Sequence, residues 1–350
     1  MNKDITVGLD LGDRFSHFCV LDEAGAVLKE DRVRTTPEAL QERFGAMKPV
    51  VLAMEVGTHS PWVSRVLSEL GHDVVVANPA KLRMIYQNPS KCDRADAMML
   101  ARVARLDRAL LSPIHHRSRG TQRDLQLLQT RNALVKTRTQ WINHMRGLAK
   151  ALGYRLPSCS APSFHKRVAK DLPEALRETM GPLLELMGRL TERIAEYTKK
   201  IELMCRDKYP QAAVLREVPG VGPITALAFV LTLEDPKRFT KSRHVGPYLG
   251  LVPRRDQSGD SDKHLRITKA GDRYLRWLLV NCAHYILGAH GPDSELRRWG
   301  LARCAQGGKT GKKRAVVAVA RKLAVLLHRL WSTGEVYDPF YTPESKTAAP

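Results

Sequence analysis

The chain has 350 residues, enough for two or three domains, and its 57 Lys and Arg against 36 Asp and Glu give a net charge of +21. Six scattered cysteines without a Cys-x-x-Cys pair argue against a disulfide framework or a zinc site. No signal peptide is visible and no apolar run reaches transmembrane length, so we expect a soluble intracellular protein that does not enter a membrane.

The positive charge is unevenly distributed along the chain. Residues 1–110 hold 15 basic and 15 acidic side chains, so residues 111–350 hold the other 42 and 21, and with them the whole net charge. We therefore expect a neutral catalytic module joined to a body that binds a polyanion. Because the basic residues cluster near glycine-rich loops that suit phosphates, nucleic acid is the favoured partner; a protein that is merely basic is the alternative.

Residues 1–110 follow the element order of an RNase H-like α/β fold, in which three strands precede alternating helices and strands. The hydrophobic periodicity and the turn residues indicate where each element lies. The predicted strands are 5–10, 16–21, 26–30, 50–55 and 73–77, and the predicted helices are 37–47, 60–70, 80–86 and 93–106.

Four carboxylates in this region lie where such a fold would gather them. Asp10 ends the first predicted strand and Glu55 ends the fourth, while Asp93 and Asp96 open the last helix. Asp93 and Asp96 are three residues apart, so they share one helix face. Acidic groups at the ends of hydrophobic strands are costly unless something pairs with them, and a divalent cation is the usual partner. The pattern predicts metal-dependent phosphoryl transfer on nucleic acid.

The middle of the chain contains two helical heptad patterns, with Pro157, Pro162 and Pro173 between them. Apolar residues recur at steps of three and four, which is typical of helices that pack along a seam. We predict antiparallel arms at 120–152 and 176–207 that serve in assembly; a plain helical linker is the alternative. The predicted seam residues are Val135, Thr139, Ile142, Met145, Ala149 and Leu152, then Leu183, Met187, Leu190, Ile194, Tyr197, Ile201 and Met204.

A glycine-rich turn follows the arms. Residues 215–226 place Gly220 and Gly222 between two apolar flanks, which is the pattern of a helix-hairpin-helix motif. In such a turn, backbone N–H groups at the start of the second helix face a DNA phosphate without side chains intervening. An ordinary tight turn between packed helices is the alternative.

Residues 240–276 form the most concentrated polar segment of the sequence. Ser258 lies on a predicted exposed turn among cationic side chains, and Ser261 is a nearby competitor. A serine hydroxyl is a weak nucleophile unless a base takes its proton and cations stabilise the developing charge. Most serines in such loops only hydrogen-bond the turn, so Ser258 alone is a weak signal. The residues expected to contact nucleic acid are Gly220, Gly222, Arg254, Arg255, Lys263, His264, Arg266, Lys269 and Arg273.

Three groups of motifs occur in order between about residues 5 and 335. The first is Gly8-Leu9-Asp10 with Glu55 and Asp93-x-x-Asp96; the second is Val-Pro-Gly-Val-Gly-Pro at 218–223; the third runs from Leu-Gly-Leu-Val-Pro-Arg at 249–254 through Ser258 to Ile-Thr-Lys-Ala-Gly at 267–271. Together they resemble the DEDD transposases of the IS110 and IS1111 insertion sequences, described as bridge-RNA-guided recombinases. Cys92 is a local departure, because Thr or Asn often precedes the first Asp of the pair.

The resemblance implies the domain organisation. A RuvC-like, RNase H-like α/β domain is expected at 1–112 and an antiparallel coiled-coil connector at 113–210. A mainly α-helical transposase domain with the helix-hairpin-helix-like motif is expected at 211–337, followed by a disordered tail at 338–350.

The resemblance also implies the chemistry and the partners. Asp10, Glu55, Asp93 and Asp96 would form the catalytic tetrad that binds Mg²⁺, with two ions expected, and Ser258 would form a covalent phosphoserine intermediate with DNA. The implied partners are donor and target DNA, a structured noncoding RNA and further copies of the chain. A dimer of dimers is expected, with the tetrad and the serine supplied by different subunits, in the nucleoid-associated part of a bacterial cytoplasm.

Three other functions are alternatives to this one. A sugar kinase or actin-like ATPase shares the pattern at 8–12, but it would need a second nucleotide-binding lobe where residues 111–350 offer a basic helical body. A RuvC-like Holliday-junction resolvase would hydrolyse DNA with the same carboxylates, and Ser258 would be dispensable. A non-catalytic DNA-binding protein would leave the four carboxylates without a role.

Overall fold

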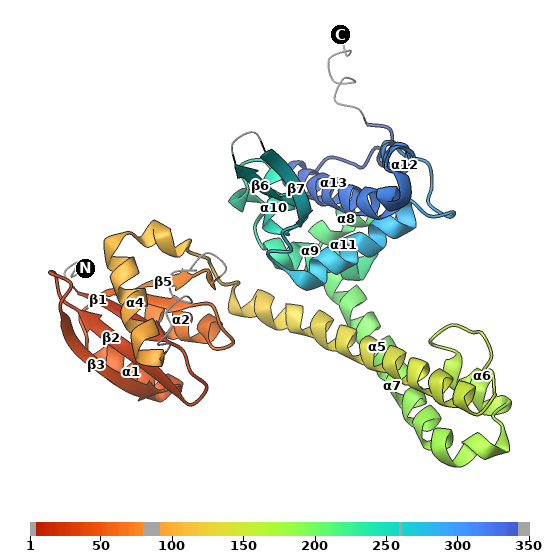
Figure 1. Ribbon diagram of the computed structural model, residues 1–350, viewed down its shortest axis with the longest axis horizontal. Helices are drawn as coiled ribbons and strands as arrows, with labels where there is room; N and C mark the ends of the chain where they lie inside the picture. The colour runs from red at the N-terminus through yellow and green to blue at the C-terminus, as the bar shows by residue number, and fades with distance from the viewer. Residues whose placement is uncertain (1–4, 80–91, 259–260, 342–350) are drawn as a thin grey trace, which may run out of the picture. The chain divides into compact units, whose positions relative to one another are not determined.

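The computed structural model describes residues 5–79, 92–258 and 261–341, with the side chains of residues 263, 264 and 309 excepted. The chain divides into two compact units, residues 1–117 and 118–350, and Figure 1 labels most of their elements. Among the described residues, no helix has both the length and the apolar character that crossing a membrane requires. The finer domain boundaries predicted at residues 112, 210 and 337 stay predictions.

The first unit is built on a five-stranded sheet with the order β3-β2-β1-β4-β5. The central strand β1 is antiparallel to β2 and parallel to β4. The first four residues of β1 and of β4 are buried, which suits strands covered on both faces. The strands span Thr6–Asp10 (β1), Phe15–Leu21 (β2), Val27–Arg34 (β3), Val51–Glu55 (β4) and Asp73–Ala77 (β5).

Helices cover both faces of this sheet. Leu52 and Met54 join one apolar cluster with α1 and α2, whereas the alternate residues Val51 and Ala53 join another with α4. These helices span Pro37–Gly45 (α1), Ser60–Glu69 (α2) and Asp93–Leu106 (α4). The predicted mixed α/β N-terminal domain is confirmed, while the helix predicted at 80–86 lies outside the described residues.

The second unit is mainly helical, as predicted for the C-terminal part, and contains one two-stranded hairpin. Its helix α9 is buried along residues 225–233 and lies in the main apolar core. The elements span Arg119–Ala151 (α5), Phe164–Lys170 (α6), Glu174–Asp207 (α7), Gln211–Arg216 (α8), Pro223–Leu233 (α9), Val245–Tyr248 (α10), Pro253–Ser258 (β6), Ser261–Ile267 (β7), Arg273–Ile286 (α11), Glu295–Gln306 (α12) and Gly311–Thr333 (α13).

The two long helices α5 and α7 pack against each other, but their contact differs in part from the predicted seam. Met187, Ile194 and Ile201 are buried as predicted. Leu190 and Tyr197, however, are only partly buried. In α5, Met145 and Ala149 are buried as predicted, whereas Leu152 is 60 % exposed.

Two arginines on α5 explain the difference in α7. The Arg131 Nε donates a hydrogen bond to Thr198 Oγ1 at 3.1 Å, and the Arg138 Nη1 donates to Thr191 Oγ1 at 3.5 Å. The arginines are seven residues apart, and so are the threonines, so each pair recurs one heptad along its helix. The threonines thus occupy contact positions that a search for apolar residues passes over.

An ion-pair cluster joins the base of α5 to the end of α7. The buried Asp124 carboxylate accepts hydrogen bonds from the Lys208 ammonium and, at 2.6 Å, from the Tyr209 hydroxyl. Burial alone would raise the pKa of Asp124, but these hydrogen bonds outweigh it and hold the pKa below its usual range. The cluster ties the two helices together next to the main core.

Candidate functional site

Asp10 and Glu55 lie side by side at one edge of the first sheet. β1 and β4 are parallel and pair Leu9 with Met54, so each strand ends with its acidic residue at the same edge. Both acidic residues are half-buried. The strand register therefore brings together the two carboxylates that the sequence places 45 positions apart.

Helix α4 carries Asp93 and Asp96 to the same edge. It packs so closely on β1 that a Cβ added at Gly8 would lie 2.0 Å from the Ala97 carbonyl oxygen. Only glycine fits such a contact, which holds the start of α4 against the end of β1. Both aspartates lie in the first turn of α4, where the positive end of the helix dipole stabilises negative charge.

His17 on β2 lies beside both Asp10 and Asp93. His17 pairs with Asp10 across the antiparallel strands, and its Nε2 lies 3.8 Å from the Asp93 Oδ2. We call the edge that holds the four predicted ligands, Asp10, Glu55, Asp93 and Asp96, the carboxylate edge. Within the part of the chain that the structure describes, no three His, Cys, Asp or Glu side chains are placed to ligate one metal ion, so an ion would have to draw the carboxylates together.

Two histidines at this edge, His17 and His59, are not among the site residues predicted from the sequence. The His59 Nδ1 accepts a hydrogen bond from the Trp62 indole N–H at 3.1 Å, and its Nε2 lies 3.5 Å from Asp13 Oδ1. His59 follows Glu55 by four residues, just before α2. The signal for His17 was its place in the second strand, but the pairing with Asp10 becomes visible only once the register is known.

The predicted glycine-rich turn joins α8 to α9. Gly220 has φ +88°, and a Cβ there would lie 2.8 Å from Tyr285 Cδ1 of α11. Gly222 is the N-cap of α9, and its position lacks a side-chain cap hydrogen bond. A Cβ at Gly222 would meet no described atom within 4 Å. The space beside the start of α9 is therefore not filled by a described side chain at this position.

Ser258 lies at the tip of the hairpin formed by β6 and β7, which we call the serine hairpin. It pairs with Ser261, and both serines are exposed. Residues 259 and 260, which link them, lie outside the described part of the chain. The structure therefore places both candidate nucleophiles at one tip.

The strand register separates the predicted cationic neighbours of Ser258. Side chains alternate between the two faces of a strand, so Ser258 shares a face with Asp256 and not with Arg255. Arg255 instead makes a two-pronged ion pair with Asp262, with N–O distances of 2.9 and 2.6 Å. His264 pairs with Arg255 and Lys263 with Asp256; the side chains of these two β7 residues lie outside the described part.

The base of the serine hairpin is tightly held. A Cβ added at Gly250 would lie 2.3 Å from the Ala270 carbonyl oxygen, so the segments before β6 and after β7 are in backbone contact. The Arg276 Nη1 donates to the carbonyl oxygens of Leu249 and Ala270 at 2.9 Å each. The other predicted contact residues, Arg266, Lys269 and Arg273, are exposed near this base.

Comparison with known proteins yields matches along most of the chain. A family model named DEDD_Tnp_IS110 and described as Transposase matches residues 7–152, and one described as Transposase IS116/IS110/IS902 family matches residues 212–297. A putative transposase of Sinorhizobium fredii is 30% identical over 84% of this chain and 76% of its own length. The transposase for insertion sequence element IS1111A of Coxiella burnetii is 28% identical over 96% of this chain and 92% of its own.

Proposed function

Because the chain belongs to the IS110 family of transposases, we propose that it recombines DNA through a covalent phosphoserine intermediate. The proposed nucleophile is Ser258. The proposed ligands of two Mg²⁺ ions are the four carboxylates of the carboxylate edge, Asp10, Glu55, Asp93 and Asp96. Donor and target DNA are the substrates, and a structured noncoding RNA guides their choice.

The observation that supports this proposal is that the three elements carrying the four acidic residues end or begin at one edge of the sheet. Two parallel strands end side by side, and a helix that is locked against Gly8 starts at the same edge. The ligand set is entirely carboxylate, which suits a hard cation such as Mg²⁺. When bound, Mg²⁺ supplies Lewis-acid stabilisation of the charge that develops on the phosphate oxygens.

The chain's own residues perform the transfer at the serine hairpin. The Ser258 hydroxyl attacks the DNA phosphorus and loses its proton, a new serine–phosphate bond forms, and one DNA strand leaves with a free hydroxyl. A hydroxyl of the second DNA then attacks the phosphoserine and releases the serine. Arg254 lies four residues before Ser258 on the same strand, and it is the cation proposed to stabilise the phosphate charge.

The remaining parts of the proposal concern nucleic-acid binding and assembly. The net charge of residues 111–350 supports DNA and RNA binding by the second unit, with the α8–α9 turn acting as a helix-hairpin-helix. The packed helices α5 and α7 are proposed to act as a coiled-coil connector in a homo-oligomer, expected as a dimer of dimers. The proposed location is the nucleoid-associated cytoplasm of a bacterium.

The decisive experiment traps the covalent intermediate. A nicked suicide DNA, incubated with the full chain, its co-purified RNA and Mg²⁺, should give a protein–DNA adduct that survives denaturation and maps by mass spectrometry to Ser258. Ser258→Ala should abolish the adduct, and Ser261→Ala, which changes the residue paired with Ser258, should retain it. An adduct on Ser261, or recombination by Ser258→Ala, would overturn the assignment; cleavage without an adduct would favour the resolvase.

A further inference from the structure

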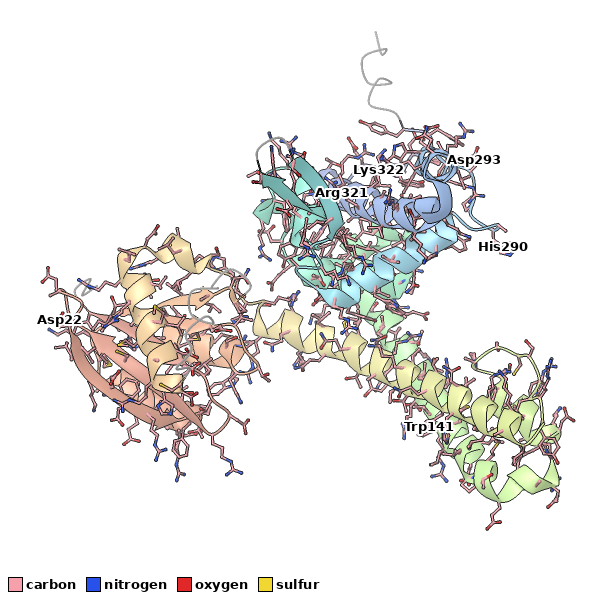
Figure 2. All side chains as sticks on the ribbon, viewed as in Figure 1. Asp22, Trp141, His290, Asp293, Arg321 and Lys322 are labelled. Carbon is pink, nitrogen blue, oxygen red and sulfur yellow. The ribbon has the colours of Figure 1, made fainter. Side chains whose placement is uncertain are left out.

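The last two long helices, α12 and α13, carry mainly positive charge, and Glu295 at the start of α12 is their one acidic residue. Residues 296–334 contain ten Lys and Arg and no Asp or Glu. Six of these cations are exposed, one on α12 and five on α13, and we call them the basic surface: Arg303, Lys312, Lys313, Arg314, Arg321 and Lys322. Figure 2 labels two of them, Arg321 and Lys322, on α13.

The cations of the basic surface differ from those of the long helix α7. The arginines of α7 are matched with acidic neighbours, as in the pairs Arg189–Glu185 and Arg193–Glu196. None of the six cations of the basic surface makes an ion pair within the described residues 5–79, 92–258 and 261–341. The charge of α7 is therefore balanced within the protein, whereas that of the basic surface is available to an external anion.

The local packing brings Arg303 and Lys322 close together despite their like charge. The Lys322 Nζ lies 4.1 Å and the Arg303 guanidinium 5.1 Å from the centre of the Trp299 ring. Burial and the charge of Arg303 lower the pKa of Lys322. The positive end of the α13 helix dipole lies at the first turn, near Lys312, Lys313 and Arg314. No acidic residue in that turn offsets it.

Arg314 and Arg321 form a pair suited to successive phosphates. They are seven residues apart on α13, which places them on one face about 10 Å apart along the helix axis. The stem of Arg321 lies against Gly246, where an added Cβ would be 3.2 Å from the Arg321 Cγ. This contact supports the side chain and leaves its guanidinium exposed.

We propose that the basic surface binds the phosphate backbone of duplex DNA, a proposal that rests on the proposed recombinase function for its choice of nucleic acid. Single strands are usually bound by exposed aromatic rings on which bases stack. Trp299, the ring that two cations of the basic surface contact, is half-buried and so leaves little of its face to a base. The basic surface therefore binds the phosphate backbone without reading the base sequence. It is a separate site from the serine hairpin and the α8–α9 turn.

The test measures binding of a labelled DNA duplex of arbitrary sequence to the full chain over a salt series, without Mg²⁺ so that no chemistry occurs. Arg314→Gln with Arg321→Gln keeps both stems and removes two charges. We expect the dissociation constant to rise at least about tenfold and the log–log salt slope to fall by about 1.8, which is 0.9 for each lost phosphate contact. Arg314→Lys with Arg321→Lys should keep most of the affinity.

The matched control is Arg189→Gln with Arg193→Gln, which removes two equally exposed but paired charges from α7. We expect its affinity to change less than about twofold, since its contact with DNA would be only through long-range charge. An equal loss in the control, or unchanged DNA binding by the α13 variant, would overturn the proposal. A loss confined to an RNA hairpin probe would overturn the choice of DNA. Because binding is measured without strand exchange, a failed Ser258 adduct would leave this result standing.

Discussion

Asp10 and Glu55 follow strand residues that are fully buried, whereas all six residues of β6, Ser258 included, are exposed. The carboxylate edge is thus held by a sheet and a helix with their own apolar clusters. The serine hairpin is anchored at its base, around Gly250, and its tip packs on no buried cluster of the described residues.

The difference indicates what the serine hairpin and the carboxylate edge each need before they can take part in the proposed reaction. A two-stranded hairpin is marginally stable by itself, so its tip takes a defined position only when another surface covers it. The carboxylate edge has its backbone already in place, because the paired strands β1 and β4 end there, and the cation of the proposed function would only have to draw the side chains together. Substitutions should therefore affect folding at the first site and leave it largely unchanged at the second.

Gly8→Ala should have the largest effect on stability. The added methyl would lie 2.0 Å from the Ala97 carbonyl oxygen, so β1 and α4 would have to separate. We expect the free energy of unfolding of the first unit to fall by about 3 kcal/mol or more. Chemical denaturation measures it, with Gly57→Ala as the control, because a Cβ there meets no described atom within 4 Å. Equal stability of the two variants would contradict the close packing of α4.

Mg²⁺ should stabilise the first unit through the carboxylate edge. A ligand that binds only the folded state raises the free energy of unfolding by about 2.7 kcal/mol at a concentration one hundred times its dissociation constant. Thermal unfolding of the full chain in Mg²⁺ and in EDTA measures this gain, and Asp10→Ala should abolish it together with strand exchange. The control Asp31→Ala removes an exposed carboxylate of β3. An undiminished gain in Asp10→Ala would place the ion elsewhere.

The sequence was sufficient to predict the order of the described strands and helices of the first unit and the element ends that carry its acidic residues, although β3 runs on to Arg34 where the strand was predicted to end at residue 30. The apolar runs that end in Asp10 and Glu55 predict two strands, and the structure confirms them as β1 and β4. The approach of α4 to Gly8 was not predictable, because it depends on which helix covers which face. The same holds for His17, whose pairing with Asp10 follows from the strand register.

The seam between α5 and α7 shows a different limit of sequence reasoning. Heptad counting finds Met187 and Ile194 because apolar residues repeat, but it favours Leu190 over Thr191 for the same reason. The buried Arg138, which hydrogen-bonds Thr191, overrides that preference because a buried guanidinium requires acceptors. The Arg–Thr contacts also repeat after seven residues, but a search that counts only apolar residues does not include them.

Asp124→Asn should destabilise the second unit by about 1–2 kcal/mol, a moderate loss because Lys208 is half exposed. The folded state holds the pKa of Asp124 below its ordinary value of 3.8. This contribution is therefore complete above that pH and is lost as the pH falls through the folded pKa. Denaturation at neutral pH and at about pH 3 should show the two proteins converging in acid. The control Asp207→Asn removes a carboxylate from an exposed pair with Arg206, and its free energy of unfolding should equal that of the unaltered chain at both pH values.

The smallest effect on stability is expected in the serine hairpin, at the ion pair between Arg255 and Asp262. Both partners are in solvent contact at the tip of an exposed hairpin, where an ion pair gains little over hydration. Arg255→Gln should therefore leave the melting temperature of the full chain unchanged. The register puts Arg255 on the face opposite Ser258, so strand exchange should also fall only slightly.

Arg254→Gln removes the same charge one residue earlier, and we expect it to slow strand exchange by about 100-fold because the Arg254 guanidinium is the group proposed to stabilise the phosphate. Single-turnover rates of the two variants measure the difference. A larger defect in Arg255→Gln would mean that the hairpin re-pairs when it engages DNA, and that its exposed register is a resting form.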